Sequence, residues 1–263
     1  MEWLDTLPFW GLYIVILACG MGALEAGYQF GRFWTRRSKA AKKDSVDSLV
    51  GAILALLAFL LVFMTGIANN RFDTRRQLVI TEANAVGTAY LRAGFLDEPA
   101  RSEVRALLRE YVGTRLEAIA VPARFVEDRA RSEAIHAQLW QYAADAGRAA
   151  PQSNTLSLFA AAVNEVINVH TQRMAAIYNR FPISNWVAIG TVALLALFAV
   201  GFNDGLSDGR ADGRALIAEF VLLLIFAAVL LLIIDLDRAG DGILRVSQQA
   251  LIDLQQQMQV GSP

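Results

Sequence analysis

The sequence predicts an all-α polytopic membrane protein with four transmembrane helices and a helical extramembrane domain between the second and the third. Of its 263 residues 55% are hydrophobic and 19% are charged, and the mean hydropathy is +0.39. This is a more apolar composition than that of most soluble domains. The sequence also contains four long apolar segments, and a central region in which charged residues are interspersed. These two features support the same prediction.

Each apolar segment has the length that a membrane helix needs, since about 20 mostly apolar residues cross roughly 30 Å of hydrocarbon. The segments cover residues 8–30, 49–68, 183–202 and 215–234. The N-terminus, MEWLDTLP, has no basic residue and no A-x-A-like site follows it, which favours a retained anchor over a cleaved signal. The predicted parts are therefore a first hairpin at 1–68, a second hairpin at 183–236 and a C-terminal tail at 237–263.

The extramembrane domain is predicted to cover residues 69–182. Asp97 with Pro99, then Pro122, then Pro151 are typical of helix starts. The helices that follow are expected to end near residues 116, 147 and 180. The region has neither a convincing alternating strand pattern nor an Asn-Gly or Asp-Gly hairpin turn between strand-like runs, so the domain is predicted to be helical.

The orientation in the membrane stays open. The loop at 32–43, RFWTRRSKAAKK, carries six basic residues, and the positive-inside rule then places it in the cytoplasm and the helical domain outside the cell. Arg210 and Arg214 bring the number of basic residues on the side of this loop to eight, against seven on the side of the helical domain. The loop itself is interpreted as a juxtamembrane linker beside anionic headgroups, and no nucleic-acid partner is predicted.

The sequence gives no sign of an enzyme. It contains no P-loop, no G-x-S-x-G and no G-x-G-x-x-G. His136 and His170 lack metal-ligand spacing, apart from Glu133 one turn before His136, and are interpreted as ordinary polar positions of the helical domain. Cys19 is the single cysteine and is interpreted as a small buried residue of the first span. No cofactor or metal is predicted.

A polar face extends the second span beyond the membrane, in FMTGIANNRFDTRRQLVITEANAVGTAYLRA at 63–93. At about 100° per residue, six side chains share this face: Asn70, Asp73, Gln77, Thr81, Asn84 and Thr88. The opposite face is apolar, and Arg71, Arg75 and Glu82 are assigned to a charged flank. An exposed helix usually carries Lys, Glu and Arg on its outer side. The nearly uncharged face instead indicates either a hydrogen-bonded seam or wet surface, or a water-filled passage.

The same face continues into the membrane through Gly66, Phe63 and Phe59. In the passage interpretation, the two phenylalanines form an apolar constriction that leads into a polar vestibule, and such constrictions can gate by dewetting. In the alternative, the rings face lipid or neighbouring helices.

Three acids in or near the spans are further candidates. A carboxylate within a span costs several kcal/mol unless it finds a partner, so Glu25 is either functional or reaches the headgroups or Arg32. Asp235 and Asp237 follow the last span. They either form a cation-attracting ring in an oligomer, or end the apolar run and pair with Arg238.

Two patterns predict packing. Small residues at every fourth position favour close approach of the first and third spans: Ala23, Gly27 and Gly31, then Gly201, Gly205 and Gly209. The tail has one apolar face, which is expected to dock on the helical domain or on a neighbouring subunit: Leu251, Leu254 and Met258.

From about Ser48 onwards the chain resembles the bestrophin-like domain family of bacterial membrane proteins. The resemblance is carried by NNRFDTRRQLVITEANAVGTAYLRA, RALLREYVGTRL and IIDLDRAGDGILRVSQQALIDLQQQM. Bestrophins are pentameric channels for anions, or in some bacterial cases cations, with a hydrophobic neck from the second membrane helix. The resemblance implies a neck at Phe59 and Phe63, and a helical domain inside the cell, which opposes the charge count.

The predicted function is an oligomeric bestrophin-like ion channel, a multi-pass protein of the bacterial inner membrane. Its expected partners are the lipid bilayer, further copies of itself, most simply in a pentamer, and small ions. The alternative is a membrane-anchored sensing or scaffolding protein whose helical domain binds a partner.

Overall fold

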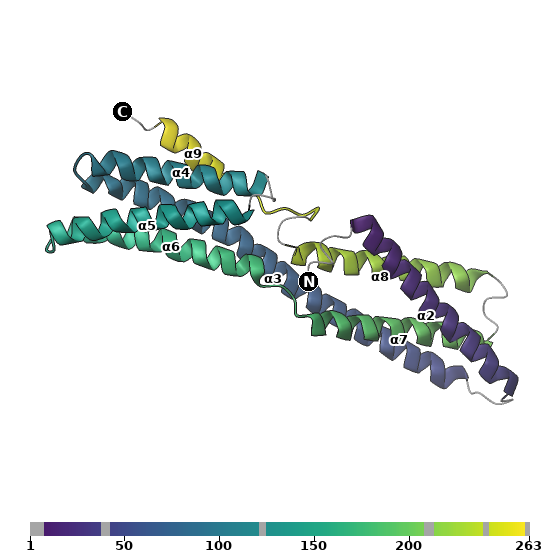
Figure 1. Ribbon diagram of the computed structural model, residues 1–263. Coiled ribbons are helices and arrows are strands. Elements are labelled where there is room, and N and C mark those ends of the chain that lie inside the picture. The colour runs from purple at the N-terminus through teal and green to yellow at the C-terminus, as the bar shows by residue number, and fades with distance from the viewer. Residues whose placement is uncertain (1–7, 38–42, 121–124, 208–212, 239–241, 261–263) are drawn as a thin grey trace. The chain divides into compact units, whose positions relative to one another are not determined.

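The computed structural model describes residues 8–37, 43–120, 125–207, 213–238 and 242–260, and over these residues it is built of helices (Figure 1). The predicted all-α class is thereby confirmed for the described residues. The elements are α2 Phe9–Arg37, α3 Lys43–Arg92, the 3-10 helix η1 Ala93–Phe95, α4 Ala100–Ala120, α5 Phe125–Ala149, α6 Asn154–Tyr178, α7 Ile183–Ser207, α8 Arg214–Asp237 and α9 Gln249–Val260.

The chain divides into two compact units. The first, here called the membrane unit, contains residues 1–70 and 180–244, and the second, the helical unit, contains residues 71–179 and 245–263. Within the described ranges, four helical stretches are long and apolar enough to cross a membrane: α2, α3, the stretch that contains α7, and α8. The predicted helix start at Pro122 and the predicted packing residue Gly209 lie outside the described residues.

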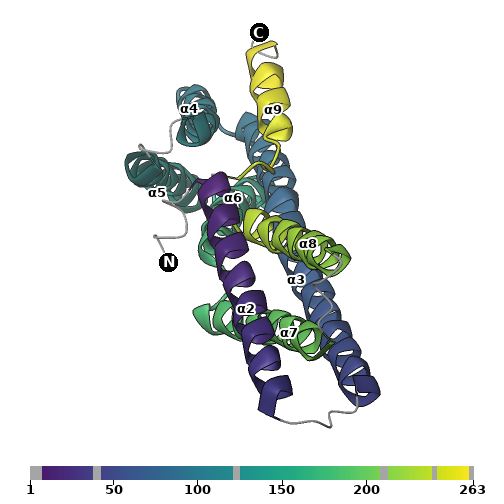
Figure 2. The ribbon, with the colours of Figure 1, turned by 90° about the vertical axis from the view of Figure 1, so that its right-hand side faces the viewer.

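In the membrane unit α2 packs along α7 with their backbones in contact (Figures 1 and 2). A Cβ atom on Gly27 would lie 2.1 Å from the carbonyl oxygen of Phe198, and one on Gly201 would lie 2.0 Å from that of Leu24. Gly31 and Gly205 meet backbone atoms of the opposite helix in the same way. The predicted close approach is confirmed at these four glycines, because no larger residue leaves room for it.

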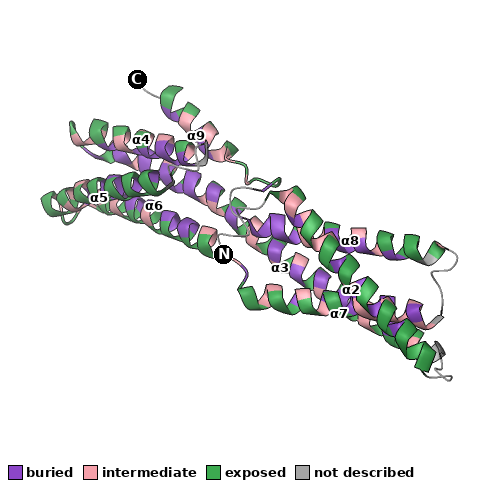
Figure 3. Ribbon diagram, turned by 45° about the vertical axis from the view of Figure 1, so that its right-hand side comes forward, coloured by how far each residue is buried: buried purple, intermediate pink, exposed green. Residues whose placement is uncertain are grey.

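In the helical unit, α5 packs between α4 and α6. The apolar side of α3 completes the core with Val79, Ala83 and Val86. The burial pattern in Figure 3 follows this packing, with buried residues on the facing sides of these helices and exposed residues outside.

At the starts of α6 and α4, polar side chains accept hydrogen bonds from backbone amides of the first turn. The Ser153 hydroxyl accepts a hydrogen bond from the Leu156 amide at 3.3 Å and caps α6. At the start of α4 the carboxylate of Glu98 accepts from the Ser102 amide at 3.2 Å. The predicted starts are therefore displaced by three residues, from 97 to Ala100 and from 151 to Asn154.

The C-terminal helix α9 docks on the helical unit of its own chain, which confirms the first of the two predicted positions. Leu251, Leu254 and Met258 are buried in the core of this unit. The Arg109 guanidinium donates to the Met258 carbonyl at 3.2 Å, and Leu254 lies against Gly87.

Candidate functional site

The membrane half of α3 leaves its aromatic face uncovered. Phe59 is 65% exposed and Phe63 is 60% exposed, and Gly66 is exposed beside them. The buried residues of this half are Val50, Leu57, Leu61, Met64 and Ala68, and from Leu57 onwards they recur every three or four positions. They lie on the opposite side of the helix, so both rings are available to lipid or to another subunit.

The second half of α3 leaves its polar face uncovered. Of the six predicted residues Thr81 is half-buried and the others are exposed: Asn70, Asp73, Gln77, Asn84 and Thr88. Both threonine hydroxyls donate to carbonyls of their own helix, Thr81 to Gln77 at 3.0 Å and Thr88 to Asn84 at 2.8 Å.

A groove of about 280 Å³ lies along this polar face, between α3 and α6. Its lining includes Thr81, Asn84 and Thr88, and also Arg92 and Glu165 at its charged margins. The Arg92 guanidinium donates to the Leu158 carbonyl at 2.9 Å, which ties the end of α3 to α6. The polar face of the helical unit is therefore hollowed between α3 and α6.

The charged flank assigned to α3 is wrong for two of its residues, because Arg75 and Glu82 are buried in the helical unit. Arg75, Val79, Glu82 and Val86 follow at spacings of four, three and four residues, which is the spacing of a single helix face. This spacing is the signal in the sequence that both side chains point into the core.

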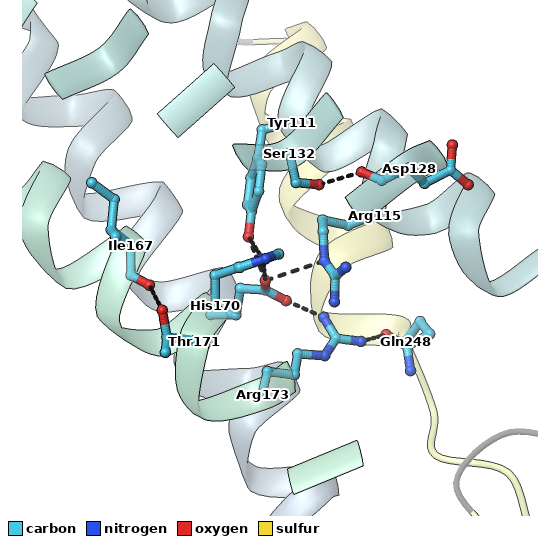
Figure 4. A network of polar contacts seen from close by, with 10 residues as sticks. Tyr111, Arg115, Asp128, Ser132, Ile167, His170, Thr171, Arg173 and Gln248 are labelled. Carbon is cyan, nitrogen blue, oxygen red and sulfur yellow. Dashed lines mark hydrogen bonds and ion pairs between the residues drawn. The ribbon is translucent and has the colours of Figure 1, made fainter. Parts of the chain in front are cut away.

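Glu82 is the centre of a buried polar cluster that sequence reasoning missed. Its Oε1 atom accepts a 2.6 Å hydrogen bond from the Tyr111 hydroxyl and lies 3.3 Å from Nε of Arg115. Its Oε2 atom pairs with the Arg173 guanidinium, whose other nitrogen donates to Gln248 at 2.7 Å. Figure 4 shows Tyr111, Arg115 and Arg173 converging from α4 and α6.

The two histidines are polar positions of the helical unit, as predicted, and they belong to the same buried cluster. Nδ1 of His170 lies 3.1 Å from the Tyr111 hydroxyl (Figure 4) and 3.9 Å from Oε1 of Glu82. The rings of His136 and His170 pack edge to face with their centroids 4.8 Å apart. Among the described residues no group of three or more His, Cys, Asp or Glu has a metal-binding arrangement.

Burial and charge fix the protonation of this cluster at neutral pH. Burial lowers the pKa of His136 from 6.5 to about 4, and the Arg115 charge acts in the same direction. Burial and then the Glu82 charge raise the pKa of Tyr111 well above its ordinary value. The tyrosine is thus a neutral donor and His136 a neutral ring, beside one carboxylate and two guanidiniums.

The acids of the membrane unit have partners within the chain. Glu25 is exposed and accepts a hydrogen bond from Gln29 at 2.9 Å. Asp235 accepts from the amides of Ile243 and Leu244 at 2.7 and 3.0 Å. Asp237 accepts from the Phe181 amide at 3.2 Å. Both aspartates are buried, so each holds a chain segment next to the end of α8.

The fold and the four apolar helices define a multi-pass helical membrane protein. Residues 21–251 match the Bestrophin-like domain, and the chain belongs to this family. The family and the fold support an ion-channel kind of protein. No curated protein matches the sequence.

Several solved structures share the fold. A bacterial bestrophin homologue from Klebsiella pneumoniae with one mutation aligns with a TM-score of 0.67 at 13% identity, over 97% of this chain and 99% of that chain. A second crystal structure, of a membrane protein variant, has the same four values. A third, also of a membrane protein variant, has a TM-score of 0.66 at 14% identity, over 95% of this chain and 98% of its own. At these identities the likeness concerns the fold alone.

Proposed function

We propose that the chain assembles into a ring in the bacterial inner membrane and conducts ions along a central passage lined by α3 of each subunit. The observation that carries the proposal is the exposure of one face on both halves of α3, apolar at Phe59 and Phe63 and polar from Asp73 to Thr88. One chain has a single such face and cannot enclose a passage alone. A closed ring of identical subunits supplies the remaining walls, and the family resemblance favours five of them.

The two halves of the face take different roles in this proposal. Phe59 and Phe63 supply the apolar constriction, where a ring of aromatic side chains excludes water unless it widens. The polar residues supply a vestibule whose amide and hydroxyl groups replace part of the hydration of an ion. In this proposal the helical unit lies outside the bilayer.

Ion flux from liposomes that contain the purified full-length protein tests the proposal. The variant Phe59→Ala/Phe63→Ala removes both rings and is expected to raise the flux about tenfold or more, because a wider constriction stays wet. The matched control is Phe220→Ala, which removes an exposed ring of α8 in the same unit and is expected to leave the flux unchanged. Native mass spectrometry should show a closed oligomer for all three proteins.

The alternative function, a membrane-anchored sensing or scaffolding protein, draws support from the separate core of the helical unit. It predicts no flux from any of these proteins although each forms the oligomer. Equal flux from the double variant and the Phe220→Ala control would also count against the constriction.

A further inference from the structure

The six residues Glu82, Tyr111, Arg115, His136, His170 and Arg173, here called the Glu82 cluster, connect all four long helices of the helical unit. We propose that this cluster is a proton-sensitive clamp, which fixes the rotation of α3 about its axis and releases it when the two histidines are protonated. Its effect on ion passage rests on the proposed function, whereas its effect on α3 does not.

The clamp holds α3 through one side chain. Glu82 follows Thr81 by one residue and precedes Asn84 by two, which corresponds to about 100° and 200° around the helix. The contacts that keep Glu82 in the core therefore keep Asn84 outward. A rotation of α3 large enough to turn the polar face away would withdraw the carboxylate from Tyr111 on α4 and from Arg173 on α6.

The hydrogen-bond pattern leaves the histidines ready to accept protons. The 2.6 Å contact shows that Tyr111 donates its proton to Glu82, so the Tyr111 oxygen accepts from Nδ1–H of His170. In that tautomer Nε2 of His170 carries a free lone pair. Among the described residues, Nε2 of His170 and Nε2 of His136 have no hydrogen-bond partner, although both atoms are buried.

Every helix around the rings contributes charge, and burial is the largest effect that opposes a further cation there. Burial and the charge of Arg115 both disfavour the protonated ring, and the partners that favour it are Glu82 and the exposed Glu133. The charged and titratable groups are Arg75 and Glu82 on α3, Tyr111 and Arg115 on α4, Asp128, Glu133 and His136 on α5, and His170 and Arg173 on α6.

Protonation changes the partners of Glu82. An imidazolium at His170, 3.9 Å from Oε1 of Glu82, competes with both guanidiniums for the carboxylate and repels them. Arg173 would loosen its hold on Gln248 as well, just before α9. The pKa of His136 is about 4 in the folded protein against 6.5 ordinarily. Its neutral ring therefore contributes stability above about pH 6.5, and that stability is lost as the pH falls towards 4.

Hydrogen exchange of the full-length protein in liposomes, between pH 7 and pH 4, tests the clamp. After correction for the intrinsic exchange rate, protection of residues 77–88 should fall about tenfold or more in the wild type, since one unit of pKa difference is tenfold. The double variant His136→Gln/His170→Gln should lose this pH dependence. The control Glu103→Gln, an exposed carboxylate that accepts from Tyr142, should keep it.

An equal fall in the double variant and the wild type, or no fall in the wild type, would overturn the clamp. If the double variant does not fold, His170→Gln alone serves, with a smaller pH dependence expected. Ion flux measured over the same pH range should change with the same midpoint as exchange. If hydrogen exchange changes with pH and ion flux does not, the clamp exists but does not control ion passage. If no flux is seen at any pH, the channel proposal fails, and the exchange experiment still tests the clamp.

Discussion

Glu82 shows how one charged residue can sit on the core face of α3. Its carboxylate is fully buried, yet it accepts a hydrogen bond from a neutral tyrosine and forms ion pairs with two guanidiniums. A buried ion pair of this kind adds little stability compared with well-packed apolar residues, because both charges lose their hydration. Removing one partner is costly, since the remaining charges stay buried without compensation.

Glu82→Gln is therefore expected to destabilise the helical unit by about 3–5 kcal/mol, because it leaves Arg115 and Arg173 facing each other without a carboxylate. Chemical unfolding followed by circular dichroism measures the change. The exposed Glu103 provides the control, and Glu103→Gln should cost less than about 1 kcal/mol. Equal losses for the two variants would mean that the cluster contributes nothing specific.

Asp73 is the only charged side chain among the six polar residues of the α3 face, and it is exposed. Asp73→Asn removes one negative charge per subunit from the proposed vestibule and should shift the permeability ratio several-fold towards anions. Reversal potentials in a salt gradient measure this ratio. Asp97→Asn, an exposed site away from this face, should leave it unchanged, and a similar shift in both would contradict the role of Asp73.

The Glu82 cluster could not be predicted from the sequence as a site. Its members come from four helices, and the contacts of Glu82 span 29 residues to Tyr111 and 91 to Arg173. The spacing of Arg75, Val79, Glu82 and Val86 does place two charges on the core face, but no local pattern names their partners. The exposed face of α3, in contrast, could be predicted from the sequence because it depends only on helical periodicity.

At the scale of elements, the contact between α2 and α7 depends on residues without a side chain. Gly27→Ala would place a Cβ atom 2.1 Å from a backbone oxygen, which no rotamer change relieves. We expect a loss of about 1–3 kcal/mol or more, seen as a lower melting temperature of the solubilised protein. Gly22→Ala is the control because no atom outside the backbone of its own helix lies within 4 Å of its Cβ position. No difference between the variants would contradict this contact.

The docking of α9 is the second prediction at this scale. Leu251→Ala removes a fully buried side chain and should cost about 2–5 kcal/mol of stability. Limited proteolysis should then cut the tail before the rest of the helical unit. Val260→Ala, at the exposed end of the same helix, should leave the tail as resistant as in the wild type. Early cleavage in both variants, or in neither, would contradict tight docking of α9.

The elements themselves were largely predictable. Hydrophobic length locates the four membrane helices, and proline positions locate the starts of α4 and α6 within a few residues. The exact starts were missed because the caps are Glu98 and Ser153, whose roles depend on the turn geometry. The position of α9 needed the structure, since an apolar face does not specify which surface covers it.

At the scale of the whole molecule, the proposed channel depends on an α3 face that lines a passage shared by the subunits. The side chains of this face are exposed in a single chain, while the opposite side of the helix is buried. A ring of subunits gives such a face a common function, because each copy contributes the same residues at the same depth. The family and the fold support an ion-channel kind of protein.

Thiol modification at Gln77 tests directly whether the polar face of α3 lines an ion passage. The experiment is feasible because the chain has a single native cysteine, Cys19, which Cys19→Ala removes. In that background Gln77→Cys places a thiol on the polar face, and Gln138→Cys places one on an exposed site of α5. Labelling with a charged methanethiosulfonate, checked by mass spectrometry, is expected to change ion flux several-fold for Gln77→Cys and to leave it unchanged for Gln138→Cys. Complete labelling at Gln77→Cys with unaltered flux would contradict the account.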